Sequence, residues 1–218
     1  MSVTDLENIH TNSVKIESIR ERADSCTDCD LAKTRTKVVF GTGNVNKKLV
    51  LVGEGPSAAD NHLGLPFIGP AGDMLQEVLI ANDITRSDLW LTNIIKCRAA
   101  ATTGHNSKNR PPKATEIKAC AKWLDSELTI IQPKVILCLG STAAKVLIHS
   151  RFRITEERGQ WFTNTYYAPY AIATYNPAYV LRQEGHKYES MRNIVIEDIA
   201  KAIEKLHQSE EIPKTTLF

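Results

Sequence analysis

Four of the five cysteines stand at positions that could bind one metal centre. Cys26 and Cys29 form a Cys-x-x-Cys pair, while Cys97 and Cys120 occur singly and much later in the chain. A close pair can ligate a metal centre to which two distant thiolates attach other segments, as in structural zinc and iron–sulfur sites. The spacing alone leaves an iron–sulfur cluster, a zinc ion and unliganded thiols open. The fifth cysteine, Cys138, lies in an apolar run and is expected to be a buried thiol.

The composition bears on whether these thiols are free or paired in disulfides. The chain has 218 residues, 42% of them hydrophobic, which fits one large α/β domain better than two small ones. No stretch approaches the ~20 apolar residues of a membrane span, and residues 1–15 lack the apolar segment of a secretory signal. We therefore expect a single cytoplasmic domain over residues 1–218, in a reducing compartment that disfavours a disulfide set.

Positive charge is concentrated in one part of the chain. The formal net charge of +2 is too small to indicate a nucleic-acid partner by itself. Residues 96–122, however, contain seven Lys or Arg and a single acid, Glu116. This stretch is either a solvated basic loop or a surface for an anionic partner.

Apolar runs alternate with amphipathic segments, and this alternation predicts the fold class. The predicted strands cover residues 48–53, 89–93, 135–140 and two short segments within 161–175; the predicted helices cover residues 13–24, 71–81, 114–131, 141–148 and 189–207. Strands that alternate with helices predict an α/β protein with a mainly parallel sheet and helices on both faces. Residues 53–56, Asn93 and residues 175–177 follow predicted strands. Because ligands bind at the carboxyl ends of such strands, these segments predict one shared crevice.

Four motifs occur in order along the chain: GEGP at 53–56, GLPFIGPAG at 64–72, TNIIKCR at 92–98 and NPAYVLR at 176–182. Together with the cysteines, they resemble the family 4 uracil-DNA glycosylases, the iron–sulfur branch of that superfamily. The resemblance implies a three-layer α/β/α fold and hydrolysis of the N-glycosidic bond of a base flipped out of DNA. It also implies a [4Fe–4S] cluster on Cys26, Cys29, Cys97 and Cys120, all within residues 13–130.

The resemblance suggests which residues bind the base. A flipped pyrimidine needs an aromatic surface, and Phe67 resembles the stacking Phe of the family, although plain core packing is the other interpretation. Asn93 resembles the Asn that recognises the hydrogen-bonding edge of the base; a turn residue at a strand end is its alternative. Backbone amides around Gly55 and Ser57 are expected to contact the base or a phosphate.

The catalytic candidates follow from the charge that bond breakage creates. Positive charge on the sugar calls for a carboxylate that orients water or stabilises the cation. Glu54 matches the GEGP motif, and Asp60 falls where the family usually carries Glu; solvated turn acids are the alternative. Asn176 replaces the usual His of a His-Pro-Ser/Ala motif. Asn can donate a hydrogen bond to the uracil O2 but cannot become cationic, so this departure leaves the base substrate open.

DNA is the expected macromolecular partner of a predicted monomer. Tyr179 and Leu181 lie where relatives insert an apolar wedge, unless they form a buried helix start. Arg182 and Arg98 are expected to hold phosphates. The tail at 209–218 is expected to be flexible, and its last five residues resemble a sliding-clamp peptide without the usual Gln.

The sequence therefore predicts a monofunctional DNA glycosylase that removes uracil or a related pyrimidine and leaves an abasic site. One alternative is a glycosylase for a modified pyrimidine, such as a hypermodified cytosine of phage DNA, with a role in defence. The other is a DNA-binding protein that has lost catalysis.

Overall fold

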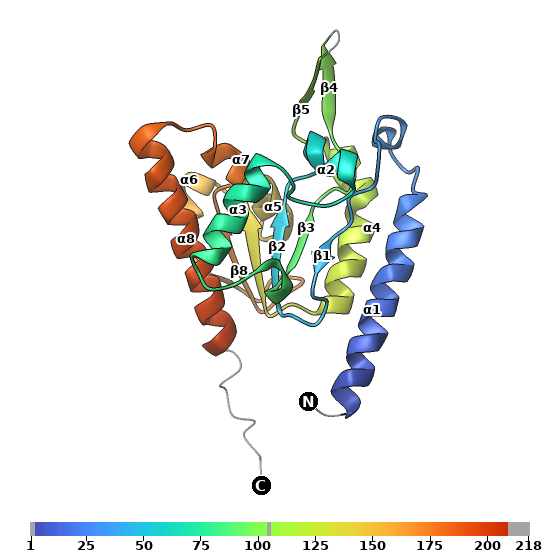
Figure 1. Cartoon of the computed structure of the whole chain (residues 1–218), viewed down its shortest axis with the longest axis horizontal. Coiled ribbons are helices and arrows are strands. Elements are labelled where there is room, and N and C mark those ends of the chain that lie inside the picture. The colour runs from blue at the N-terminus through green and yellow to red at the C-terminus, as the bar shows by residue number, and fades with distance from the viewer. Residues whose placement is uncertain (1–2, 104–105, 209–218) are drawn as a thin grey trace.

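The computed structural model describes residues 3–103 and 106–208 and contains a six-stranded sheet flanked by helices (Figure 1). The strand order is β1-β3-β2-β6-β8-β7. The four inner strands are parallel, and the two short edge strands are antiparallel to their neighbours. The strands are β1 (Thr42–Gly43), β2 (Leu49–Gly53), β3 (Trp90–Asn93), β6 (Val135–Leu139), β7 (Phe162–Thr163) and β8 (Tyr170–Thr174).

Helices cover both faces of this sheet, which confirms the expected three-layer α/β/α fold. Helices α1 (Val3–Asp24), α4 (Ala114–Ile131) and α5 (Ser141–Leu147) pack on one face. Helices α3 (Pro70–Ile80) and α8 (Gly185–Gln208) pack on the other. The short elements are α2 (Ala58–Leu63), α6 (Ile154–Glu157), α7 (Pro177–Val180) and the 3-10 turns η1 (Asp30–Lys33) and η2 (Arg86–Asp88).

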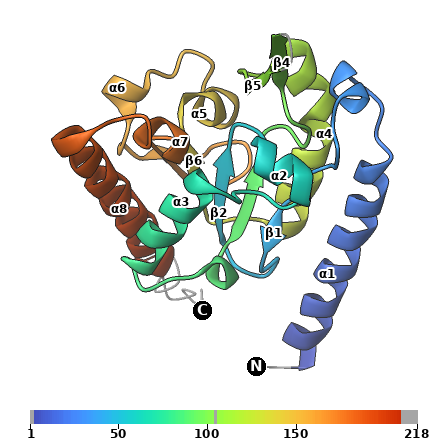
Figure 2. The same cartoon turned by 45° about the horizontal axis from the view of Figure 1, so that its top comes forward.

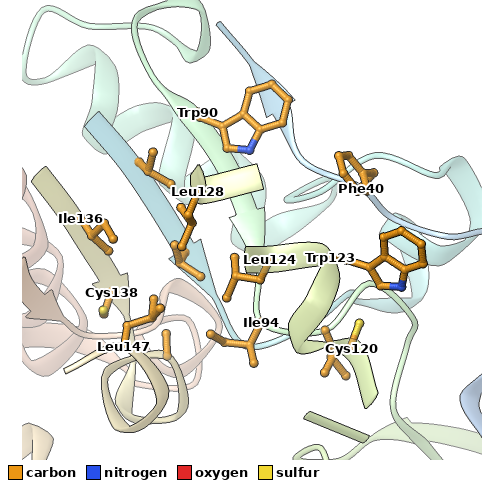
Figure 3. Packing of buried hydrophobic residues seen from close by; sticks show 14 of the residues in the cluster. Phe40, Trp90, Ile94, Cys120, Trp123, Leu124, Leu128, Ile136, Cys138 and Leu147 are labelled. Atoms are coloured by element: carbon orange, nitrogen blue, oxygen red, sulfur yellow. The ribbon is translucent and has the colours of Figure 1, made fainter. Parts of the chain in front are cut away.

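The alternation of side chains along β2 explains why this sheet needs two helical layers. Val50 and Val52 face the layer that contains α4, whereas Leu49 and Leu51 face the layer that contains α3. All four are at most 1% exposed, so the strand is buried on both faces, as parallel strands usually are. Figure 3 shows the first of these cores, where Cys138 lies among apolar side chains as expected. Burial raises the pKa of this thiol.

The connections proceed toward opposite edges of the sheet from the two parallel central strands β2 and β6. The chain runs from β2 to β3 on one side of β2, and from β6 to β8 on the other side of β6. The carboxyl ends of β2 and β6 therefore lie side by side with their connections diverging, which creates a crevice in parallel sheets. Figure 2 shows α2, α3, α5 and α7 around this end of β2.

The basic stretch contains a β-hairpin rather than a simple loop. Strands β4 (Ala100–Thr103) and β5 (Asn106–Asn109) pair only with each other among the described residues, and they project from the molecule at the end where α2 lies (Figure 1). At its base, Arg98 donates to Asn109 Oδ1 at 2.7 Å and to the Ser107 carbonyl at 3.0 Å. Sequence patterning missed the hairpin because its small and polar residues have no apolar alternation.

Two expectations from the sequence concerned membrane-spanning segments and the tail of the chain. Within the described residues, no helix combines the length and the apolar character needed to cross a membrane. The tail at 209–218, with its resemblance to a clamp peptide, lies outside the described residues.

Candidate functional site

The four cysteines predicted to bind a metal centre line one small cavity, together with side chains that include Arg35, Lys96 and Trp123. Cys26 and Cys29 come from the segment after α1, Cys97 follows β3, and Cys120 lies on α4, as Figure 3 shows for the last of these. The fold thus brings together thiols that are up to about a hundred positions apart in sequence. Among the described residues, no three His, Cys, Asp or Glu side chains form a group that could hold a single metal ion, whereas a cluster of several iron atoms binds thiolates that lie further apart.

Nitrogen donors surround the sulfur atoms of this cavity. Arg35 Nη1 lies 3.6 Å from Cys97 Sγ, and the Lys96 backbone amide donates to Cys120 Sγ at 3.2 Å. Burial raises the pKa of the Cys97 thiol and raises that of Cys120 to about 11, while the cations Arg35 and Lys96 oppose these increases. Four thiols, two of which have N–H donors and positive charge beside them, form a donor set that fits an anionic thiolate-ligated cluster.

Glu54 directly follows the carboxyl end of β2, beside the end of the parallel strand β6, where parallel sheets form a ligand crevice. Its side chain is partly exposed, and its Oε2 accepts a hydrogen bond of 2.5 Å from the Thr142 hydroxyl. Thr142 belongs to α5, which begins directly after β6 and Gly140. Sequence reasoning missed Thr142; its only signal was a position just beyond the end of a predicted strand.

Asp60 has a different environment. It is 4% exposed, and both carboxylate oxygens accept backbone amides: Oδ2 from Ser57 at 2.9 Å and Oδ1 from Ile68 at 2.7 Å. The Ser57 hydroxyl accepts the Asp60 amide at 3.2 Å, which completes a capping box at the start of α2. Asp60 thereby connects α2 to the loop that carries Phe67. The Ser57 amide, expected to contact a ligand, is directed at Asp60.

Phe67 and Asn93 meet over Gly53. A Cβ atom placed on Gly53 would lie 2.5 Å from Asn93 Oδ1 and 2.5 Å from Phe67 Cζ, so only glycine leaves room for both side chains. Phe67 has a φ of +55°, and Arg86 Nη2 holds its carbonyl at 2.6 Å. Asn93 is 2% exposed, and its Nδ2 has no hydrogen-bond partner among the described residues. A buried amide donor without a partner is a group that a ligand can satisfy.

Asn176 lies at the carboxyl end of β8, on the other side of β6 from Glu54. Its Oδ1 accepts the Ala178 amide at 2.8 Å and caps α7, which leaves Nδ2 as a donor. A Cβ atom on Gly140 would lie 2.9 Å from Asn176 Cβ. Asn176 therefore packs against the residue that precedes α5. Gly55, near Glu54, packs closely against Ile95.

The residues expected to contact DNA fall into two groups. Tyr179 is 40% exposed, and its ring is tilted against that of Tyr175 at a centroid distance of 6.1 Å. The Arg182 guanidinium carbon lies 5.6 Å from the centre of the Tyr179 ring. Leu181 is half-buried and packs against the core beside α3 and α8. Arg98 is at the base of the β4–β5 hairpin and lies away from these three residues in sequence and in the fold.

A buried ion pair, which sequence reasoning also missed, joins the two halves of the site. Lys96 Nζ contacts Glu127 Oε2 at 2.5 Å, Thr92 Oγ1 at 2.6 Å and the Asn93 carbonyl at 2.9 Å. Both charged side chains are at most 1% exposed. Since the Lys96 amide also donates to Cys120 Sγ, one residue contacts both the cysteine cavity and the strand end that carries Asn93.

Comparisons with known proteins agree with this arrangement. A family model described as the uracil DNA glycosylase superfamily matches residues 40–200. The type-4 uracil-DNA glycosylase of Thermotoga maritima is 36% identical over 89% of this chain and 96% of its own length. That of Archaeoglobus fulgidus is 36% identical over 76% of this chain and 84% of its own.

A solved structure supports the fold independently. The crystal structure of wild-type SMUG2 of Pedobacter heparinus has a TM-score of 0.55, with 12% sequence identity, over 75% of this chain and 77% of that chain. At that identity the likeness shows the fold alone. The family model and the two curated relatives together cover most of this chain, including every candidate site residue. The chain therefore belongs to the uracil-DNA glycosylase superfamily and, within it, to the type-4 uracil-DNA glycosylases.

Proposed function

We propose that this protein is a DNA N-glycosylase that removes uracil flipped out of DNA and leaves an abasic site. The observation that carries the proposal is the buried Asn93 amide, whose Nδ2 has no partner among the described residues, beside the ring of Phe67. Relatives with 36% identity are named type-4 uracil-DNA glycosylases, and these names favour neither a modified pyrimidine nor a non-catalytic binding role.

Asn93 and Phe67 have the chemistry that a uracil pocket needs. The ring of Phe67 offers a stacking surface for a flipped pyrimidine. The Asn93 Nδ2 can donate to uracil O4 while Oδ1 accepts from N3–H. Cytosine presents an amino donor and an unprotonated ring nitrogen at the same positions, so this amide in this orientation would reject it.

Glu54 and Asn176 would act on opposite sides of the bond. The bond between the sugar C1′ and uracil N1 breaks with its electron pair leaving on the base. A water oxygen forms the new bond to C1′, and the Glu54 carboxylate orients this water and takes its proton. The Asn176 Nδ2 donates to uracil O2 as negative charge develops there, and the uracil anion then takes a proton from solvent.

The cysteine cavity would hold a [4Fe–4S] cluster on Cys26, Cys29, Cys97 and Cys120. The chemistry of the donor set supports this assignment, since four thiols line one cavity beside Arg35 and Lys96. Bound there, the cluster would cross-link the segment after α1, the end of β3 and α4, and would thereby stabilise the fold. Free thiols that can hold such a group suit a reducing, cytoplasmic compartment.

DNA would lie across the end of the molecule that carries the crevice. The exposed Tyr179 and Arg182 would contact the strand next to the flipped nucleotide, with Leu181 supporting them from the core side. Arg98 would contact phosphates from the hairpin. We expect a monomer to suffice, because each proposed catalytic and base-binding residue comes from the same chain.

Oligonucleotides that carry uracil, hypoxanthine or a modified cytosine, with alkali to reveal abasic sites, test this function. We expect excision of uracil and no cleavage of unmodified cytosine. Asn93→Asp keeps the size of the side chain but removes the donor, and it should lower uracil excision by ~10² or more. Excision of only a modified cytosine would replace uracil as the substrate. DNA binding without excision of any base would overturn the enzyme assignment.

A further inference from the structure

The carboxylate of Glu54 is fixed from one side by a residue of another element. The Thr142 hydroxyl donates to Glu54 Oε2 at 2.5 Å across 88 positions of sequence. Both side chains are partly exposed, so the contact lies at the wall of the crevice rather than in the core. No described residue donates to Oε1, which leaves that oxygen available for a water molecule.

The position of Thr142 follows from how α5 begins. Gly140, with a φ of +100°, donates its amide to the Thr174 carbonyl at 2.9 Å and turns the chain from β6 into α5. Ala143 and Ala144, directly after Thr142, are completely buried against the sheet. These contacts hold the backbone at Thr142 while its hydroxyl points along the end of β2 toward Glu54.

The backbone of Glu54 is held as well, whereas its side chain is held only by the Thr142 hydroxyl among the described residues. Gly53 pairs with Asn93 at the end of the parallel β2–β3 ladder, and the Glu54 carbonyl accepts the Ile95 amide at 3.4 Å. The glutamate side chain itself rotates about three bonds, so ordering it in one rotamer costs entropy. A hydrogen bond from a fixed hydroxyl to the ionised carboxylate offsets that cost before substrate binds.

We propose that Thr142 is a positioning residue that holds Glu54 Oε2 so that Oε1 faces the attacking water. This inference rests on the proposed glycosylase function and adds to it a residue from β6–α5 that acts only through Glu54. Because placement errors of about 1 Å can lower enzymatic rates by ~10²-fold, loss of this contact should affect the chemical step.

Two substitutions separate the hydroxyl from the shape of the side chain. Thr142→Val keeps the branched shape and removes the donor, whereas Thr142→Ser keeps the donor and removes a methyl group. We expect Thr142→Val to lower single-turnover uracil excision by ~10- to 30-fold, with DNA affinity, visible absorbance and melting temperature close to wild type. Thr142→Ser should stay within ~3-fold of wild type. Thr142→Ala provides a second donor-free variant should the valine protein fold poorly.

A double-mutant cycle then tests whether Thr142 acts through Glu54. In a Glu54→Gln background, Thr142→Val should cause almost no further loss of rate. A full additional loss there, a wild-type rate in Thr142→Val, or equal losses in the Val and Ser variants would each overturn the inference while leaving the glycosylase function intact. A wild-type protein that excises no base would overturn both.

Discussion

The cysteine cavity and the catalytic crevice are held together in different ways. The cavity gathers four thiols from three segments that are far apart in sequence. In the crevice, the polar side chains are fixed by the protein itself: Thr142 holds Glu54, and Asp60 accepts the amides of Ser57 and Ile68. The crevice is preorganised by hydrogen bonds, whereas under our proposal the cavity relies on its bound group to connect its walls.

This difference predicts that the two regions fail differently. Substitutions in the crevice should lower the rate of chemistry and leave the fold intact. Substitutions in the cavity should lower stability first and affect catalysis through it. The buried Lys96 contacts both regions, so the distinction between effects on rate and effects on stability does not apply to it.

Glu54→Gln should produce the largest effect, because it removes the carboxylate that we propose orients water while preserving the side chain's size. We expect single-turnover uracil excision to fall by ~10²- to 10³-fold, about 3–4 kcal/mol, with DNA binding and visible absorbance unchanged. Rapid-quench kinetics and a binding titration measure the two quantities. A wild-type rate would place the catalytic group elsewhere.

Cys120→Ala should affect the cavity most strongly among its thiols, because under our proposal the cluster links α4 to the other segments through this side chain. We expect loss of iron and of the absorbance near ~400 nm typical of thiolate-ligated clusters, and a melting temperature lower by roughly 5–10 °C. Cys138→Ala is the matched control: Cys138 is equally a buried thiol but lies outside the cavity, so the protein should keep its colour. A colourless wild-type protein that binds one zinc ion would contradict the cluster assignment.

Asp60→Asn should have a smaller effect than Glu54→Gln, because the structure places Asp60 behind the loop that carries Phe67. The amide can still accept from one backbone N–H but not from both. We expect excision within ~10-fold of wild type, about 1 kcal/mol, expressed mainly as weaker substrate binding. A rate loss as large as that of Glu54→Gln, with binding unchanged, would make Asp60 a catalytic carboxylate.

Asn176→His should produce the smallest change and the only gain. A histidine can donate to uracil O2 and can also carry charge, so uracil excision should rise by about 3- to 10-fold. The same change disturbs the Asn176 cap of α7, which should cost about 0.5–1 kcal/mol of stability. Parallel measurements of excision and thermal unfolding separate the two effects. Lower uracil excision would indicate a pocket shaped for another pyrimidine.

Helices and strands could be predicted from the sequence where burial imposes a periodic pattern of apolar residues. The helix predicted at 114–131 is confirmed with the same bounds, and the predicted strands match β2, β3 and β6 to within one residue. The helix predicted at 71–81 matches α3 to within one residue, and its Met74, Leu75, Val78 and Leu79 are all buried. Where polar residues dominate, the predictions fell short: α1 and α8 begin earlier than the apolar pattern suggests.

Contacts between side chains of distant segments could not be predicted from the sequence. The carboxyl ends of β2, β6 and β8 lie at one edge of the sheet as expected, but no local pattern could show that Thr142 meets Glu54 or that Lys96 meets Glu127. Each of these pairs joins segments that become neighbours only through the order of the strands. Glu54 and Asp60 were both catalytic candidates in the sequence, and their hydrogen-bond partners in the structure now separate their environments.

The crowding at Gly53 affects how a mutational scan of this protein would read. Any side chain at this position would strike Asn93 and Phe67 at once, so nearly every replacement should abolish activity although glycine contributes no reactive group. A scan that ranks positions by sensitivity would therefore place Gly53 beside Glu54. Comparing which sizes of side chain each position tolerates, rather than how much activity is lost, would distinguish Gly53, where only size matters, from residues with a chemical role.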